Sequence, residues 1–243
     1  MKFASATATA IFGLLLIGNE NLRAAEGSYI YSGRVTEIDG ITQQIEPILE
    51  KFHQTARIDF HTDKCGLGGD GPFDFRSVPF PATIVRPPNT DANPLAAIQS
   101  IFRDDPSVVV TQDETGLIRL RIGHASGALL ETKINKIKFT PEAQYNVRFA
   151  IDHLEETPAV KAAMIRLKRH PNILPYIGGV MDPTPGWPHL PPQMSNTTYG
   201  ELLNVIAQTF SGIVSHGECD NPGRIVTNFH YVFDKRRFPP NSR

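Results

Sequence analysis

The sequence has few cysteines and no surplus of either charge. Only two cysteines occur in 243 residues, and 24 lysines and arginines stand against 25 aspartates and glutamates. Without a basic surplus there is no global field to attract nucleic acid, so that class of partner is excluded. The sequence also lacks the G-x-S-x-G and H-E-x-x-H motifs and the spacings of calcium loops and zinc sites. We therefore expect no cofactor.

Long apolar runs are also scarce, and the one that stands out lies near the N-terminus. Residues 10–17 read AIFGLLLI, Lys2 precedes them, and two alanines come just before Glu26. This is the layout of a cleaved secretory signal, and the run is too short to span a bilayer. We predict a signal peptide over residues 1–25 and a secreted or periplasmic mature chain without a membrane span. An uncleaved N-terminal anchor is the alternative.

Export determines how the two cysteines are interpreted. In an oxidising compartment an even number of cysteines favours pairing, and Cys65–Cys219 is the one intramolecular bond available. The loss of chain entropy in the unfolded state gives a ceiling of about 5 kcal/mol for so long a loop. We predict this disulfide, with two buried free thiols as the alternative.

The cysteines end two similar stretches of sequence. Residues 48–65 read ILEKFHQTARIDFHTDKC, and residues 202–219 read LLNVIAQTFSGIVSHGEC. Both patterns predict an amphipathic helix, a short apolar strand and a cysteine in a glycine-containing turn. We interpret them as a duplicated α–β unit. The equivalent apolar side chains should be buried in one shared layer of core: Phe52 with Ile206, and Phe60 with Val214.

Helix followed by strands recurs elsewhere in the chain. A helix beginning at Asn93, with proline at its first position, leads into a β-hairpin that ends at residue 122. A helix capped by Thr198 leads into two strands that end at residue 233. Another helix is predicted over residues 158–169.

These elements predict an α+β fold. Repeated helix–strand–strand units should pack their helices on a mostly antiparallel sheet, with proline-rich connecting loops. The 20 prolines and 19 glycines favour many such connections. After the signal peptide we place a first α+β unit pair at 26–140, a second at 141–233, and a flexible basic tail at 234–243.

The helix-plus-hairpin segments resemble the short secretin/TonB N-terminal modules, the STN-like domains of bacterial envelope proteins. TTYGELLNVIAQTFSGIVSHGECDNPGRIVTNFHYVF matches best, followed by NPLAAIQSIFRDDPSVVVTQDETGLIRLRI. The resemblance implies a small α+β module that mediates protein contacts. It does not carry over the activity of a secretin or a transporter.

Three polar residues alternate along one predicted strand. Asp59, His61 and Asp63 should point to the same face, and carboxylates with an imidazole suit a divalent metal. The simpler interpretation is a solvated polar face opposite Ile58 and Phe60. We therefore assign no catalytic or metal-binding residue, and keep these three as candidates.

Two further places could carry function. Trp187 and His189 lie in a proline-rich loop, where an exposed aromatic side chain could be a contact hot spot or could fold back onto the core. Glu155 and Glu156 are adjacent, so their side chains diverge. We interpret them as the solvated approach to a helix and not as an acid/base pair.

The function that these observations favour is an exported, non-catalytic protein that contacts an unknown envelope or extracellular protein. Two alternatives stay open. One is an exported hydrolase or metal-dependent enzyme that uses Asp59, His61 and Asp63, and the other is a protein that binds a small ligand between its units.

Overall fold

The structure, a computed structural model, describes residues 33–35, 38–64, 82–84, 93–103, 105–123, 127–171, 186–221 and 223–232. The predicted signal peptide, Cys65 and the predicted tail lie outside the described residues. None of the described helices is long and apolar enough to cross a membrane.

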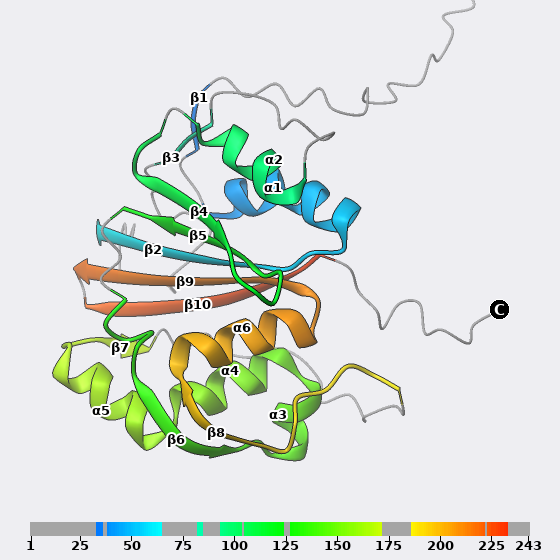
Figure 1. Cartoon of the computed structure of the whole chain (residues 1–243). Helices are drawn as coiled ribbons and strands as arrows, with labels where there is room; N and C mark the ends of the chain where they lie inside the picture. The colour runs from blue at the N-terminus through cyan, green and yellow to red at the C-terminus, as the bar shows by residue number, and fades with distance from the viewer. Residues whose placement is uncertain are drawn as a thin grey trace, which may run out of the picture.

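Helices and strands are interspersed along the described part of the chain (Figure 1). The helices are α1 (Ile38–Phe52), α2 (Pro94–Ile101), α3 (Pro141–Tyr145), α4 (Val147–Glu155), α5 (Pro158–Arg166) and α6 (Tyr199–Thr209). The strands are β1 (Gly33–Val35), β2 (Ala56–Lys64), β3 (Ala82–Ile84), β4 (Val108–Gln112), β5 (Ile118–Ile122), β6 (Lys133–Lys138), β7 (His170–Pro171), β8 (Gln193–Thr198), β9 (Gly212–Asn221) and β10 (Arg224–Tyr231).

The centre of the fold is a six-stranded sheet in the order β4-β5-β2-β9-β10-β7. The hairpins β4–β5 and β9–β10 are antiparallel, as the sequence predicts, and both join β2 through parallel pairings. Helices α1 and α2 lie on one side of the sheet, and α3 to α6 lie on the other (Figure 1). The predicted α+β fold class is confirmed, but the central sheet is mixed and not mostly antiparallel, because three of the five pairings between its described strands are parallel.

The helix starts follow the predicted capping signals. The Asn93 side chain accepts a hydrogen bond from the Ala96 N–H at 2.8 Å, and Pro94 occupies the first helical position. At the start of α6, Thr198 and Glu201 form a reciprocal capping box. These caps fix the residues at which α2 and α6 begin.

The two similar stretches of sequence form neighbouring parallel strands. α1 leads into β2 and α6 leads into β9, and the two strands pair in parallel. Their helices cover opposite faces of the sheet, as a rotation about an axis along the strands would place them (Figure 1). The prediction of one shared layer is therefore wrong, because Phe60 lies in the core under α1 and Val214 in the core under α6.

Burial also differs between the equivalent helix positions. Ile206 is fully buried, as predicted, whereas Phe52 is only partly buried at the rim of the core under α1.

Phe60 lies directly opposite Gly217 on β9. A Cβ atom at position 217 would lie 2.0 Å from Phe60 Cζ, so the ring occupies the space that any side chain there would need.

Candidate functional site

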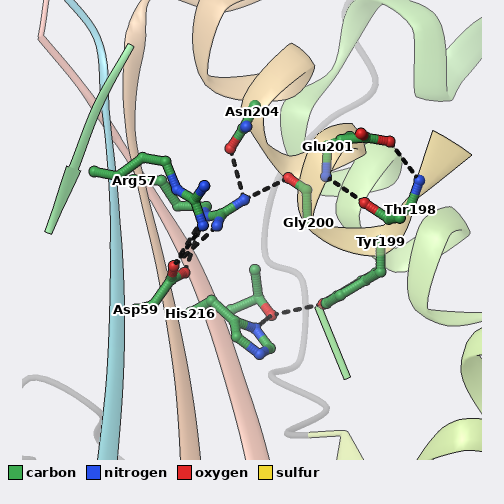
Figure 2. A network of polar contacts seen from close by, with 10 residues as sticks. Arg57, Asp59, Thr198, Tyr199, Gly200, Glu201, Asn204 and His216 are labelled. Carbon is green, nitrogen blue, oxygen red and sulfur yellow. Dashed lines mark hydrogen bonds and ion pairs between the residues drawn. The ribbon is translucent and has the colours of Figure 1, made fainter. Parts of the chain in front are cut away.

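A layer of polar side chains lies between helix α6 and strands β2, β9 and β10 (Figure 2). On β2, Arg57 and Asp59 alternate with Ile58, so the two charged residues face α6 while the isoleucine joins the core under α1. Arg57 is 2% exposed and Asp59 is 3% exposed. A buried charged pair of this kind requires internal partners for both groups.

The planar guanidinium of Arg57 donates hydrogen bonds both to Asp59 and to helix α6. Nη2 donates to Asp59 Oδ2 at 2.9 Å, and Nε lies 2.9 Å from Asp59 Oδ1. Nη1 donates to the carbonyl of Gly200 and to Oδ1 of Asn204, both at 2.6 Å (Figure 2). One side chain therefore ties β2 to the first turns of α6.

Gly200 makes this contact possible. A Cβ atom at position 200 would lie 3.0 Å from Arg57 Nη1 and 3.1 Å from the carbonyl oxygen of Leu130. The absence of a side chain lets the guanidinium approach the helix backbone closely.

The position of Asp59 corrects the predicted solvated face. Burial raises the pKa of its carboxyl, and the neighbouring Arg57 opposes that shift. Alternation on β2 is as predicted, but α6, which follows about 140 residues later in the chain, covers the polar side. Asp59 is therefore held in an internal ion pair.

A second polar group runs from β9 to α4 through β10. His216 Nδ1 lies 3.3 Å from Thr227 Oγ1, which lies 3.2 Å from the Tyr199 hydroxyl (Figure 2). The same hydroxyl donates to Glu155 Oε1 at 3.3 Å. Four side chains from four elements are thus linked beneath α6.

Burial perturbs each ionisable member of this second group. It lowers the pKa of His216 to about 3, with a further contribution from the positive charge of Arg57. It raises the pKa of Glu155 to about 7 and that of Tyr199 well above its usual value. Glu155 is half-buried and bonded to Tyr199, so its predicted role as a solvated approach to a helix is wrong.

His61 belongs to a third group near the C-terminal ends of β2 and β9. Its Nε2 lies 3.0 Å from Asp220 Oδ2, and Arg169 Nη2 donates to Asp220 Oδ1 at 2.6 Å. The Arg169 hydrogen bond is the main reason why the pKa of Asp220 is lowered. The side chain of Asp63 lies outside the described residues. Among the described side chains, no group of three or more His, Cys, Asp or Glu residues is placed to hold a metal ion.

The face of the β4–β5 hairpin beside this polar layer is exposed. Arg119 and Arg121 project from β5, and Val109 and Thr111 project from β4 on the same side. Arg119 Nη2 lies 3.9 Å from Asp59 Oδ2, and its pKa is lowered by burial and by Arg57. Sequence reasoning missed these arginines, although the alternation in IRLRI was the signal for an exposed polar side.

The predicted contact loop is packed against the helices on the α6 side. Trp187 is half-buried and His189 is exposed, and the imidazole stacks on Tyr145 with ring centroids 5.2 Å apart. Leu190, the next residue, is fully buried, and its N–H donates to the carbonyl of Gln144. The role of Trp187 and His189 as a contact surface stays a prediction.

Comparison of the chain with protein-family models, curated proteins and solved structures finds no match. The resemblance to the short secretin/TonB N-terminal modules therefore stays a prediction.

Proposed function

We propose that this is an exported, non-catalytic protein that acts by binding another protein of the envelope or the extracellular space. The observation that carries the proposal is the uncovered side of the β4–β5 hairpin, where Val109 is 43% exposed beside two exposed arginines. Large exposed apolar residues next to arginine are typical of contact surfaces.

The use of the polar residues supports the same conclusion. Arg57 and Asp59 bind each other and α6, and His216 and Glu155 belong to a buried chain of hydrogen bonds. These interactions position helix α6 on the sheet. The helix in turn leaves β4 and β5 free to present their polar side.

Export and a Cys65–Cys219 bond are part of the proposal. Cys219 is completely buried in β9, where it lies opposite Thr62 of β2, three residues before Cys65. Three residues span about 10 Å along a strand, so the bond requires the chain after Lys64 to turn back toward Cys219 until the two Cα atoms are within about 7 Å. Peptide mapping of the exported protein without reduction should recover the linked pair, and two alkylatable thiols would contradict it.

Site-specific photo-crosslinking in the organism that makes the protein tests the interaction. A photoreactive amino acid in place of Thr111 should give a discrete adduct with a second protein. The same group in place of Ile165, which is 78% exposed on α5, is the matched control and should not give that adduct. Identical adduct patterns from the two positions, or none from position 111, would refute the β4–β5 surface as the contact site.

A further inference from the structure

The outer edge of β4 carries backbone groups that no described strand pairs. β4 is an edge strand, and its one described partner is β5. The Gly123 N–H donates to the Ser107 carbonyl and the Asp113 N–H to the Leu117 carbonyl, so the odd-numbered residues between them face β5. Val108, Val110 and Gln112 therefore direct their N–H and C=O groups away from the sheet.

Two of these outward groups are already bonded within the protein. The Val108 N–H donates to the carbonyl of Asp105, and Gln99 Nε2 donates to the Val110 carbonyl at 3.1 Å. The Val110 N–H and both backbone groups of Gln112 have no bond among the described residues. The strand reads VVVTQ, and it has neither a proline nor a lysine, the residues that commonly block such an edge.

The charged side chains on the exposed side of the β4–β5 hairpin are mainly arginines, and the carboxylates of Asp59 and Asp113 act on one of them, Arg119. Arg57, Arg119 and Arg121 all act on the carboxylate of Asp59, and both hydrogen bonds that Arg57 donates to it go to Oδ2. Asp59 Oδ1 lies 2.9 Å from Arg57 Nε but accepts no hydrogen bond among the described residues. Arg121 makes no ion pair with any described residue. It lies opposite Val109, and Arg119 lies opposite Thr111, so both arginines project on the exposed side of the hairpin. Arg119 Nη2 lies 3.9 Å from Asp59 Oδ2 on β2, the other neighbour of β5, so Arg119 must turn from Asp59 to reach a carboxylate at the β4 edge, whereas Arg121 has no ion pair among the described residues to leave.

We propose that β4 accepts an extended, acidic segment of a partner protein as an added strand, with carboxylates of that segment over Arg119 and Arg121. The inference rests on the proposed function and names the chemistry of its partner. Backbone hydrogen bonds to the edge supply affinity, and the arginines select for acidic side chains. A second copy of this chain fits poorly, because pairing β4 with β4 places the arginines of both copies on one continuous face.

A blocked peptide of about eight residues that alternates glutamate and threonine is the probe, and its lysine-for-glutamate counterpart is the control. Amide exchange measured by NMR on the full mature protein should slow by about tenfold at Val110 and Gln112 when the acidic peptide saturates the site. The lysine peptide should leave both rates unchanged. Absence of acidic-peptide binding, or binding without this protection, would overturn the proposal.

Two variants separate the edge from the charge. Gln112→Pro removes an outward N–H without touching the bonds to β5, so it should abolish amide protection at Val110, while Gln112→Ala should bind like the wild type. Arg119→Ala with Arg121→Ala should weaken acidic-peptide binding at low salt by about fivefold or more. Unchanged protection of Val110 in Gln112→Pro, unchanged affinity in the double arginine variant, or a dimer of this chain that Gln112→Pro dissociates would refute the acidic strand. The adduct at position 111 would then still stand as the test of the proposed function.

Discussion

The two faces of the central sheet are built in different ways. Under α1 and α2 the sheet presents a continuous apolar layer, which includes Ile58, Phe60 and Leu120. Under α6 the centre of the contact is the Arg57–Asp59 pair, with apolar side chains such as Val214 and Ile225 beside it. Burial of apolar area supplies stability without specifying a position, whereas paired charges stabilise only one placement of the helix. The polar face therefore fixes where α6 lies, and the position of α6 leaves β4 and β5 open.

The largest effect that would test this comparison is the loss of one partner of the buried pair. Asp59→Ala leaves the Arg57 guanidinium buried without its carboxylate, and we expect a loss of about 3–5 kcal/mol of unfolding free energy. The double variant Arg57→Met with Asp59→Leu removes both charges and should recover most of that loss. Urea denaturation of the two proteins measures the difference.

The matched control lies one residue away on the other face of β2. Ile58→Ala should cost about 2–5 kcal/mol, because it opens a cavity in the core under α1. No change at Arg57 should restore that loss. If Asp59→Ala costs less than about 0.5 kcal/mol, the carboxylate is solvated and the contrast between the faces fails.

The second prediction compares the two α–β units. Ile206 is fully buried under its helix, so Ile206→Ala should cost about 2–5 kcal/mol. Phe52→Ala, at the equivalent position, should cost less, because that ring is only partly buried. Denaturant melts of both variants give the order, and an equal or larger loss for Phe52→Ala would show that the two units bury their helices to the same depth.

Local sequence signals were sufficient for the elements whose apolar spacing is regular. Asn93 with Pro94, and Thr198 with Glu201, mark helix starts that the structure confirms. The sequence prediction lacks α4, although Val147, Ile151 and Leu154 have helical spacing and Asn146 is a good cap. Each of these signals depends on neighbours within one or two turns of the chain.

Long-range placement could not be obtained in the same way. Alternation on β2 separates Asp59 from Phe60, but it does not say which side a helix will cover. That choice depends on contacts between residues far apart in sequence, such as Arg57 with Asn204. The same limit applies to the candidate site. The sequence does not show that β4 is an edge strand, and the exposed arginines of β5 are candidates for binding because they lie next to that edge.

The third prediction uses two groups of the polar face whose ionisation opposes each other. The pKa of Glu155 is raised from 4.5 to about 7, so its stabilising contribution is complete below pH 4.5 and is lost as the pH rises through 7. The pKa of His216 is lowered from 6.5 to about 3, so its contribution is complete above pH 6.5 and is lost as the pH falls. Between pH 4.5 and 6.5, the Glu155 contribution to the unfolding free energy therefore falls as the pH rises, and the His216 contribution increases.

Single substitutions should reveal the pH dependence that each of the two groups gives to the unfolding free energy. Relative to wild type, Glu155→Gln should lose up to about 3 kcal/mol of stability on going from pH 6.5 to 4.5, since only the histidine dependence remains. His216→Gln should gain a similar amount over the same range. Urea melts across this range measure both, and parallel profiles for the two variants would show that these groups do not titrate with folding.

The smallest effect is expected at His61, two residues beyond Asp59 on the same side of β2. Its side chain is 20% exposed and its partner Asp220 is 47% exposed, so water screens the pair. Asp220 also keeps its hydrogen bond from Arg169 when the imidazole is removed. We therefore expect His61→Ala to change the unfolding free energy by less than about 0.5 kcal/mol, against about 3–5 kcal/mol for Asp59→Ala.

Melts of the wild type and of His61→Ala with added zinc and with a chelator provide the control. A stability difference between the two that disappears in His61→Ala would identify a metal ligand at this position and favour the metal-dependent enzyme.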